Sequence, residues 1–234
     1  MVFSSFKSNH VPRGSLRDRP SIEPSQQLVV DAFGMVEKGI SVTGFTITDM
    51  GANRQIAVHA QVLNVAQSVE QTTIIAATEA MEWLVAEKMH KKQVILRMSN
   101  MNAYILISGN TANAGEDTWK VLRQFQANAS MFPYLDLRLV SPSEVEGTRQ
   151  QTEKIYVAHQ EGKRWQRAKS TLSELEQVSD TKFAVGERYI VDLETIHCTC
   201  PDFQHTYTKR FPIRCKHILA AMIIKQGNTD DESQ

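Results

Sequence analysis

The chain has 234 residues, 41% of them hydrophobic, which is enough for one ordinary core and a small additional module. Lysine plus arginine and aspartate plus glutamate both total 26, so a global charge excess that attracts nucleic acid or membranes is excluded. No stretch reaches the ~18–20 consecutive apolar residues that span a bilayer, and we expect a soluble protein with no membrane partner.

The first 26 residues form a segment rich in Ser, Pro and Arg, in which Asp18 and Glu23 are the acids. The segment lacks hydrophobic periodicity and cannot bury enough surface to order itself, so we predict a disordered arm. It has no apolar signal-peptide core, and we expect an intracellular reducing compartment, nucleus or cytoplasm. A basic, Ser-rich start is also typical of organelle transit peptides, which leaves organelle import as an alternative.

Three short β-rich runs follow at 28–33, 40–48 and 55–62, separated by Gly-containing turns. Alternation of apolar and polar residues in the third run predicts a strand with one face on a core. Together the runs predict a three-stranded antiparallel meander.

A helix is predicted over 68–89, because apolar residues recur there at helical spacing. Glu79 and Trp83 are expected on the side opposite this stripe, and the helix is expected to lie across the meander. The residues of the stripe are Ile74, Ala77, Met81, Leu84 and Val85.

The rest of the first domain alternates strands with helices. We expect strands at 93–98 and 135–139, helices at 101–108 and 116–129, and a final helical stretch from near 143 towards 169. This order predicts an α/β fold, a mixed five-stranded sheet with flanking helices. The predicted organisation is a disordered arm (1–26), an α/β domain (27–160), a helical linker (161–180), a small C-terminal module (181–226) and an acidic tail (227–234).

The order of elements, with Asp31 in the first strand, resembles the ribonuclease H-like fold over 27–160. Enzymes of that family place acids in strand one, the first helix, the end of strand four and the last helix, where they hold two divalent ions. Here Ala77 best matches the helix position, and Ser99 and Asn100 stand at the end of the fourth strand. In the last helix the corresponding residues are Gln150, Gln151 and Thr152, with Glu153 next to them.

With most of these acids missing, the sequence predicts no nuclease activity. Asp31 is then expected to be a strand-end carboxylate satisfied by backbone donors, and Glu79 and Glu82 to lie on a solvated helix face. A metal-dependent nuclease using Asp31, Glu79 and Asp117 remains a third possibility, which convergence of these groups in one pocket would support.

All three cysteines of the chain lie within eighteen residues, in the arrangement Cys198-x-Cys200-x14-Cys215-x-His217. A closed Cys₃His set gives tetrahedral Zn²⁺ four protein ligands and leaves no open position to activate water. The alternative, three buried cysteines and a core histidine without metal, leaves unexplained why every cysteine falls in this pattern. His197 and His205 are expected to be surface histidines.

The residues around the ligands resemble the SWIM-type zinc finger family. The resemblance lies in Cys200-Pro-Asp-Phe-Gln204 after the first pair and in Cys215-Lys-His-Ile-Leu-Ala-Ala221 leading into a helix. A hairpin over 183–191 around Gly186 is expected before the first pair, as in SWIM fingers. The resemblance implies one structural Zn²⁺.

Basic and aromatic side chains around the finger suit phosphate contact and base stacking. An alternative is that the cations only offset the cluster's net charge, near −1 with zinc bound, and that Phe203 and Phe211 are the finger's core. The candidate nucleic-acid-binding residues are Lys209, Arg210, Arg214, Lys216 and Tyr207 in the finger, and Lys163, Arg164 and Arg167 beside Trp165 in the linker.

A ribonuclease H-like domain followed by a SWIM finger is similar to the layout of Mutator-type transposases and their relatives. The combination implies a catalytically silent relative. The leading hypothesis is a zinc-dependent protein that binds DNA or RNA and is not an enzyme. The alternative is an adaptor that uses the finger to bind a protein partner.

Overall fold

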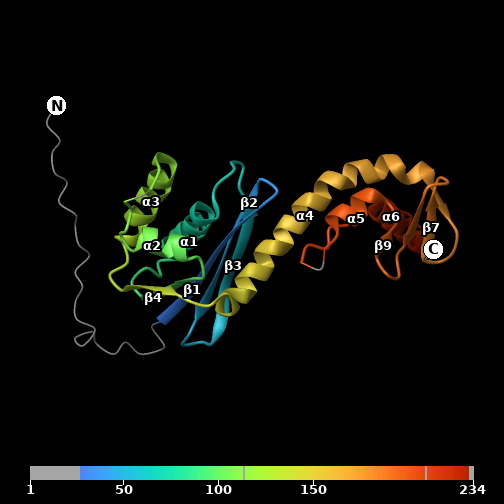
Figure 1. The fold of residues 1–234 in the computed structure, drawn as a ribbon. Coiled ribbons are helices and arrows are strands. Elements are labelled where there is room, and N and C mark those ends of the chain that lie inside the picture. Colours follow the sequence, from blue (N-terminus) through green and yellow to red (C-terminus); the bar gives the residue numbers. More distant parts are fainter. Residues whose placement is uncertain (1–26, 113, 209, 232–234) are drawn as a thin grey trace.

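The structure is a computed structural model that describes residues 27–112, 114–208 and 210–231. The expected arm (1–26) and Lys209 lie outside the described residues. A large sheet with its helices and a small sheet with two helices of its own are joined by one long helix, α4 (Figure 1). None of the described helices combines the length and apolar character needed to cross a membrane.

The large sheet has five strands in the order β3-β2-β1-β4-β5. The first three strands pair antiparallel, as the predicted meander requires, whereas β4 is parallel to both β1 and β5. Lys38 and Gly39 connect β1 to β2 with positive φ angles of 50° and 74°, as tight hairpin turns require. The strands are β1 (Gln27–Glu37), β2 (Ile40–Asp49), β3 (Arg54–Val62), β4 (Gln93–Met98) and β5 (Leu135–Leu139). The mixed five-stranded sheet is confirmed.

Helices cover both faces of the large sheet (Figure 1). On one face, Thr43 of β2 donates a hydrogen bond to Glu79 of α1 (3.0 Å). On the other face, the hydroxyl of Thr46 of β2 forms a hydrogen bond with the hydroxyl of Thr148 of α4 (2.8 Å). Side chains alternate between the two faces of a strand, so residues 43 and 46 point to opposite faces, in agreement with these two contacts. The helices of the first domain are α1 (Val69–Ala86), α2 (Met101–Ile107), α3 (Glu116–Ala129) and α4 (Glu146–Thr171).

The main core lies between α1 and the large sheet. Ile74, Ala77, Met81 and Leu84 are at most 1% exposed, so the predicted stripe is confirmed there. Trp83 was expected on the opposite side, but it is partly buried against the same core. A Cβ atom on Gly34 would overlap the backbone of α1 at Thr73, so the close approach of β1 to this helix requires glycine.

Helix α4 is the longest element, with 26 residues, or about 39 Å at 1.5 Å per residue. A short 3-10 turn, η2 (Pro142–Val145), precedes it, capped reciprocally by Ser141 and Glu144. Its first half packs on the large sheet, where Gly44 leaves room for Thr152, and its second half runs on to the small sheet (Figure 1). The helix therefore crosses the boundary expected at 160 without a break and includes half of the expected linker.

The C-terminal part builds a four-stranded sheet in the order β6-β7-β8-β9. The expected hairpin is present, and Gly186 at its turn has a positive φ of 54°. Strand β6 lies inside the expected linker, and α6 continues through residue 227, where the acidic tail was expected to begin. The elements are η3 (Leu172–Glu174), β6 (Leu175–Gln177), β7 (Lys182–Val185), β8 (Tyr189–Asp192), β9 (His197–Cys198), α5 (Pro201–Thr206) and α6 (Lys216–Asp231).

Candidate functional site

The four predicted metal ligands meet at the junction of the small sheet with its two helices. Cys198 ends β9, Cys200 caps the start of α5, Cys215 precedes α6, and His217 lies in its first turn. Their ligand atoms all lie within 4.8 Å of one another, and all four residues are buried. The local turns thus bring two pairs, separated by fourteen residues in the sequence, to one point.

This geometry fits a tetrahedral zinc ion. Cys198 Sγ lies 3.7 Å from His217 Nδ1, close to the edge of about 3.6 Å expected from Zn–S of about 2.3 Å and Zn–N of about 2.0–2.1 Å. The backbone N–H groups of Cys200 and Phe203 donate to the sulfurs of Cys198 and Cys200, at 3.5 and 3.4 Å. The four side chains are positioned to hold Zn²⁺ in a closed set, so the chemistry that the metal supplies is structural.

The thiols of the cluster are strongly coupled. The pKa of Cys215 is lowered to about 4 from an ordinary 9.0, chiefly because the Cys198 thiol donates a hydrogen bond to it, with further donors at His217 and the backbone of Ile218. The same shared proton, together with burial, raises the pKa of Cys198. One thiolate is therefore already favoured in the protein alone, and zinc binding must displace the remaining protons.

A small core surrounds the ligands. Phe183, Val191 and Ile218 are completely buried in it, and Tyr189 stacks on His217 with ring centroids 5.3 Å apart. His197 and His205 are exposed, as expected for surface histidines. The core of the finger is so small that the metal has to supply much of its folding free energy.

The loop between α5 and α6 docks on the first domain. Phe211 and Ile213 are 8% and 3% exposed because they pack against Met35, Val42 and Tyr156 on the α4 side of the large sheet. The rings of Phe211 and Tyr156 are 5.0 Å apart. Phe211 therefore belongs to a core shared with the first domain and not to the finger's own core, whereas Phe203 belongs to the finger.

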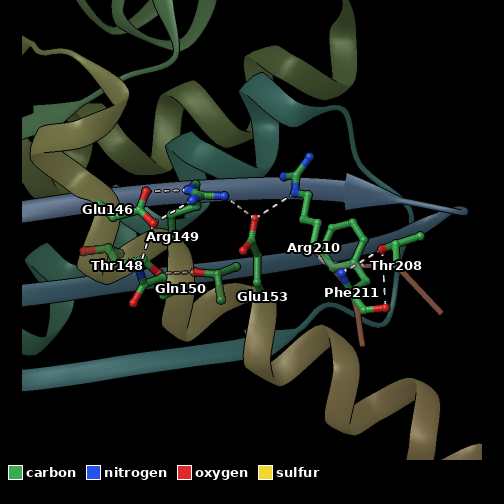
Figure 2. Close-up of polar contacts among 9 residues, drawn as sticks. Glu146, Thr148, Arg149, Gln150, Glu153, Thr208, Arg210 and Phe211 are labelled. Atoms are coloured by element: carbon green, nitrogen blue, oxygen red, sulfur yellow. Dashed lines mark hydrogen bonds and ion pairs between the residues drawn. The ribbon is translucent and has the colours of Figure 1, made fainter. Parts of the chain in front are cut away.

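Two of the predicted nucleic-acid-binding arginines pair with glutamates of α4. Arg214 binds Glu161 through Nε (2.8 Å), Nη2 (2.5 Å) and its own backbone N–H (2.9 Å), and this contact raises the pKa of Arg214. Arg210 binds Glu153 through Nε (2.9 Å), as Figure 2 shows, and is 54% exposed. Arg214 therefore uses its hydrogen bonds to hold the finger against α4. Arg210 uses only its Nε for this contact.

Three other predicted residues converge on one cavity of about 1130 Å³, which we call the finger cavity. Arg164 and Arg167 of α4 line it together with Lys216 of α6, and Arg188 joins them from the hairpin turn. Tyr189 and the ligand His217 also line it, and so do three carboxylates: Glu174, Glu187 and Asp202. Sequence reasoning missed Arg188, although its place in the expected hairpin was the available signal.

Arg164 has an unusual environment in the finger cavity. Its Nη2 donates to Asp202 (3.2 Å), while its Nη1 is buried and has no hydrogen-bond partner among the residues that the structure describes. Lys163, Arg167 and Trp165 are exposed on the same helix. Tyr207, by contrast, stacks on Phe203 at 4.7 Å and belongs partly to the finger's core.

The carboxylates considered for a nuclease do not meet. Asp31 lies in the middle of β1 and binds Arg97 of β4 twice, at 2.6 and 2.9 Å, instead of the backbone donors expected at a strand end. Asp31 is paired in register with Thr46, which faces α4, whereas Glu79 lies on the α1 face. Asp117 pairs with Lys120 on the surface of α3 (3.0 Å).

The helix carboxylates also have partners that the sequence did not reveal. Glu79 accepts hydrogen bonds from Thr43 (3.0 Å) and Gln61 (2.6 Å). Glu82 accepts from Gln124 and Asn128 of α3, both at 3.0 Å. Glu82 is exposed, as expected for a solvated helix face, although it also links α1 to α3, whereas Glu79 is half-buried and links α1 to β2 and β3.

The position of Glu153 in α4 is close to the last acid expected for the family. Its Oε1 accepts from Arg149 (2.7 Å) of the same helix and from Arg210 of the finger loop (Figure 2). Ala77, the helix position expected to match the family's glutamate, is buried in the core. The α1 residues that do reach a cavity at the strand ends, beside Ser99 and Asn100, are Val69 and Thr73.

Comparisons with known proteins find similarity for both the zinc finger and the N-terminal domain. Residues 189–226 match the SWIM zinc finger family. The chain is similar in structure to RNase H1 from the halophilic archaeon Halobacterium salinarum NRC-1, at 11% identity and a TM-score of 0.51, over 56% of this chain and 97% of that one. It is also similar to the N-terminal RNase H domain of a Mycobacterium tuberculosis protein, at 17% identity and a TM-score of 0.50, over 55% of this chain and 92% of that one.

At these identities the likeness to ribonucleases H shows the fold alone. No curated protein matches the sequence. The chain therefore combines a domain of ribonuclease H-like fold with a C-terminal segment that matches the SWIM zinc finger family, whose Cys₃His set is positioned to hold zinc.

Proposed function

We propose that this chain is a zinc-dependent nucleic-acid-binding protein, in which the finger and the second half of α4 contact the strand and the ribonuclease H-like domain does not cleave it. The observation that carries the proposal is the finger cavity. Residues from α4, the hairpin and α6 that are up to about fifty positions apart bring four cations and Tyr189 to one hollow beside the zinc ligands. Cations next to an aromatic ring suit phosphate contact and base stacking.

The charge of the finger cavity is mixed, which makes the exposed face of α4 part of the same interface. Three carboxylates line the cavity, and one of them, Asp202, is paired with Arg164. Lys163, Arg167 and Lys169 are exposed on α4, and Trp165 is 36% exposed among them. A polyanion lying along this helix would contact its cations while a base or sugar enters the cavity.

The proposal of a silent domain is supported by the way its carboxylates are used. Within the described ranges, the Cys/His cluster is the only group of three or more His, Cys, Asp or Glu side chains that could hold a metal ion. Two-metal cleavage of a phosphodiester needs several carboxylates around one point. Here Asp31 and Glu79 lie on opposite faces of the sheet, and each has a protein partner.

The proposal is tested by binding of the full, zinc-loaded chain to labelled single- and double-stranded DNA, RNA and their hybrid across a salt series. Replacing Lys163 and Arg167 together by Gln should weaken binding and reduce the salt slope by about 2, one for each phosphate that is no longer neutralised. The matched control replaces Lys120 and Arg123 by Gln, two exposed cations of α3, and should change neither the affinity nor the slope.

No binding by a folded, zinc-loaded chain would overturn the binding role. Cleavage of any of these strands with Mg²⁺ or Mn²⁺, abolished by Glu79→Gln, would overturn the silent domain and restore the nuclease hypothesis.

A protein adaptor is the second candidate, and the surface of α2 favours it. Met101 and Ile105 are 53% and 38% exposed and lie one turn apart on this helix. Neighbouring exposed apolar side chains of this kind are common where proteins bind other proteins. A purified partner whose binding is abolished by Met101→Glu with Ile105→Glu, and kept in the Lys163/Arg167 variant, would assign this class.

A further inference from the structure

A second cavity, of about 250 Å³, opens where β1 and β4 end. We call it the strand-end cavity. Because β1 and β4 are parallel, their carboxyl ends meet at one edge of the sheet, where α/β proteins commonly bind ligands. Its lining comes from residues 32–37 of β1, Val69 and Thr73 of α1, Ser99 and Asn100 after β4, and Arg210 of the finger loop.

The strand-end cavity is rich in hydrogen-bond donors that the protein itself does not use. Among the described residues, neither the Ser99 hydroxyl nor the Asn100 side-chain N–H₂ has a partner, since Asn100 caps α2 through its Oδ1 (2.9 Å to the N–H of Ala103). Within the same part of the chain, the terminal nitrogens of Arg210 are likewise without a protein partner. Three donors, one of them charged, are therefore available to a ligand.

The side chain of Arg210 is held in place by contacts that leave its two terminal nitrogens available. Its Nε donates to Glu153, and its guanidinium lies over the ring of Phe211, 4.8 Å from the centroid (Figure 2). Phe211 is itself fixed in the core shared by the two domains. A guanidinium held at one edge by a carboxylate and on one face by a ring keeps its Nη edge oriented for a second, bidentate acceptor.

The charge around the strand-end cavity favours an anion over a metal ion. Glu37 is the single carboxylate in its described lining, which is too few for a divalent cation. Asp31 lies outside this lining and is paired with Arg97, while Glu153 shares its charge between Arg149 and Arg210. An entering anion is therefore opposed by Glu37 alone among these lining residues.

We propose that the strand-end cavity binds a phosphate group of a nucleic-acid strand directly, with the Nη edge of Arg210 supplying the charge and Ser99 and Asn100 supplying hydrogen bonds. The identity of the phosphate's source rests on the proposed function. The finger loop then completes a binding site on the ribonuclease H-like domain, so both parts of the chain contact one strand.

The experiment is an NMR titration of the ¹⁵N-labelled, zinc-loaded full chain, first with inorganic phosphate and then with a short oligothymidylate. The amide signals of Thr73, Ser99 and Arg210 should shift with both probes. Arg210→Gln should weaken phosphate binding about tenfold, as removal of a charge-assisted pair predicts, and Arg210→Lys should be intermediate because it keeps the charge but not the fork.

Two further variants should change the affinity for phosphate in opposite directions. Glu37→Gln removes the opposing carboxylate and should tighten binding, whereas Asn100→Asp keeps the cap of α2 and places a new carboxylate beside the phosphate, so it should weaken binding. Far-UV circular dichroism and urea midpoints check that each variant is folded.

The outcomes separate this site from the proposed function. Oligothymidylate binding with shifts confined to the finger cavity, unchanged by Arg210→Gln and Asn100→Asp, overturns the strand-end site and leaves the proposed function standing. Shifts with inorganic phosphate that respond to these variants, but no binding of oligothymidylate or of RNA, support the phosphate site and overturn nucleic acid as its source.

Discussion

The Cys/His cluster of the finger and the carboxylates of the large sheet are both candidate ligand sets, but only the first converges. The four zinc ligands come from two pairs of next-but-one neighbours, so a hairpin end and two helix starts suffice to bring them together. Asp31 of β1 and Glu79 of α1 instead have side chains on opposite faces of the sheet: Asp31 on the α4 face and Glu79 on the α1 face. A site built across strands depends on strand register, since a shift of one residue moves a side chain to the other face.

Asp31 and two glutamates of α4 have arginine partners in place of a metal ion. Asp31 pairs with Arg97, Glu161 with Arg214, and Glu153 with both Arg149 and Arg210. A partly buried carboxylate needs a compensating charge, and a guanidinium meets that need with two fixed hydrogen bonds. The pairs of Glu153 and Glu161 also join the finger to α4, so electrostatic compensation and domain packing use the same residues.

Zinc removal should destabilise the protein most, and it should act on the finger and not on the large sheet. A zinc chelator, or Cys215→Ser, is expected to unfold the finger, because structural zinc contributes on the order of 10 kcal/mol in small zinc modules. Hydrogen exchange should become fast in β7, β8 and α6, while β1, β4 and α1 of the large sheet stay protected. Acidification should act in the same direction, since protons compete with zinc for the thiolates and for His217.

The control for zinc removal is His205→Ala, which removes an exposed histidine of the same finger and should retain one zinc per chain by elemental analysis. If the finger keeps its exchange protection after complete chelation, the metal is not what holds it, and the small hydrophobic core is sufficient.

Asp31→Asn should have the next largest effect, a decrease of about 2 kcal/mol in the free energy of unfolding. The side chains of Asp31 and Arg97 are only 12% and 26% exposed, so the variant leaves a guanidinium largely buried without its charged partner. Urea unfolding measures the decrease. The matched control is Asp136→Asn, whose partner Arg138 is 53% exposed, and it should change stability by less than about 0.5 kcal/mol.

The sequence predicted the sheet and its helices well because their patterns are local. Alternation in 55–62 and the stripe Ile74, Ala77, Met81 and Leu84 each report one face of one element. The zinc ligands were predictable for the same reason. The pairing of Asp31 with Arg97 was not, because it depends on which strands become neighbours and in which register.

The docking of the finger was the other feature beyond the reach of the sequence. Phe211 looked like either a nucleic-acid contact or part of the finger's core, and nothing near it in the sequence indicates that Met35 and Tyr156 cover it. Arg214 similarly carried no sign of its pairing with Glu161, 53 positions earlier. Contacts between distant segments need the fold before any residue pattern can reveal them.

Glu79→Gln should have the smallest effect on the free energy of unfolding. It tests directly whether this carboxylate binds a metal ion. Glutamine can still accept a hydrogen bond from Thr43 or Gln61, so the free energy of unfolding should fall by less than about 1 kcal/mol. If Glu79 were a metal ligand, Mg²⁺ or Mn²⁺ would stabilise the native protein and the variant would not show that stabilisation. We expect the urea midpoints of both proteins to be unaffected by either ion, because the carboxylate serves to tie α1 to β2 and β3. A cation-dependent midpoint in the native protein that disappears in Glu79→Gln would instead place a metal on the α1 face of the sheet.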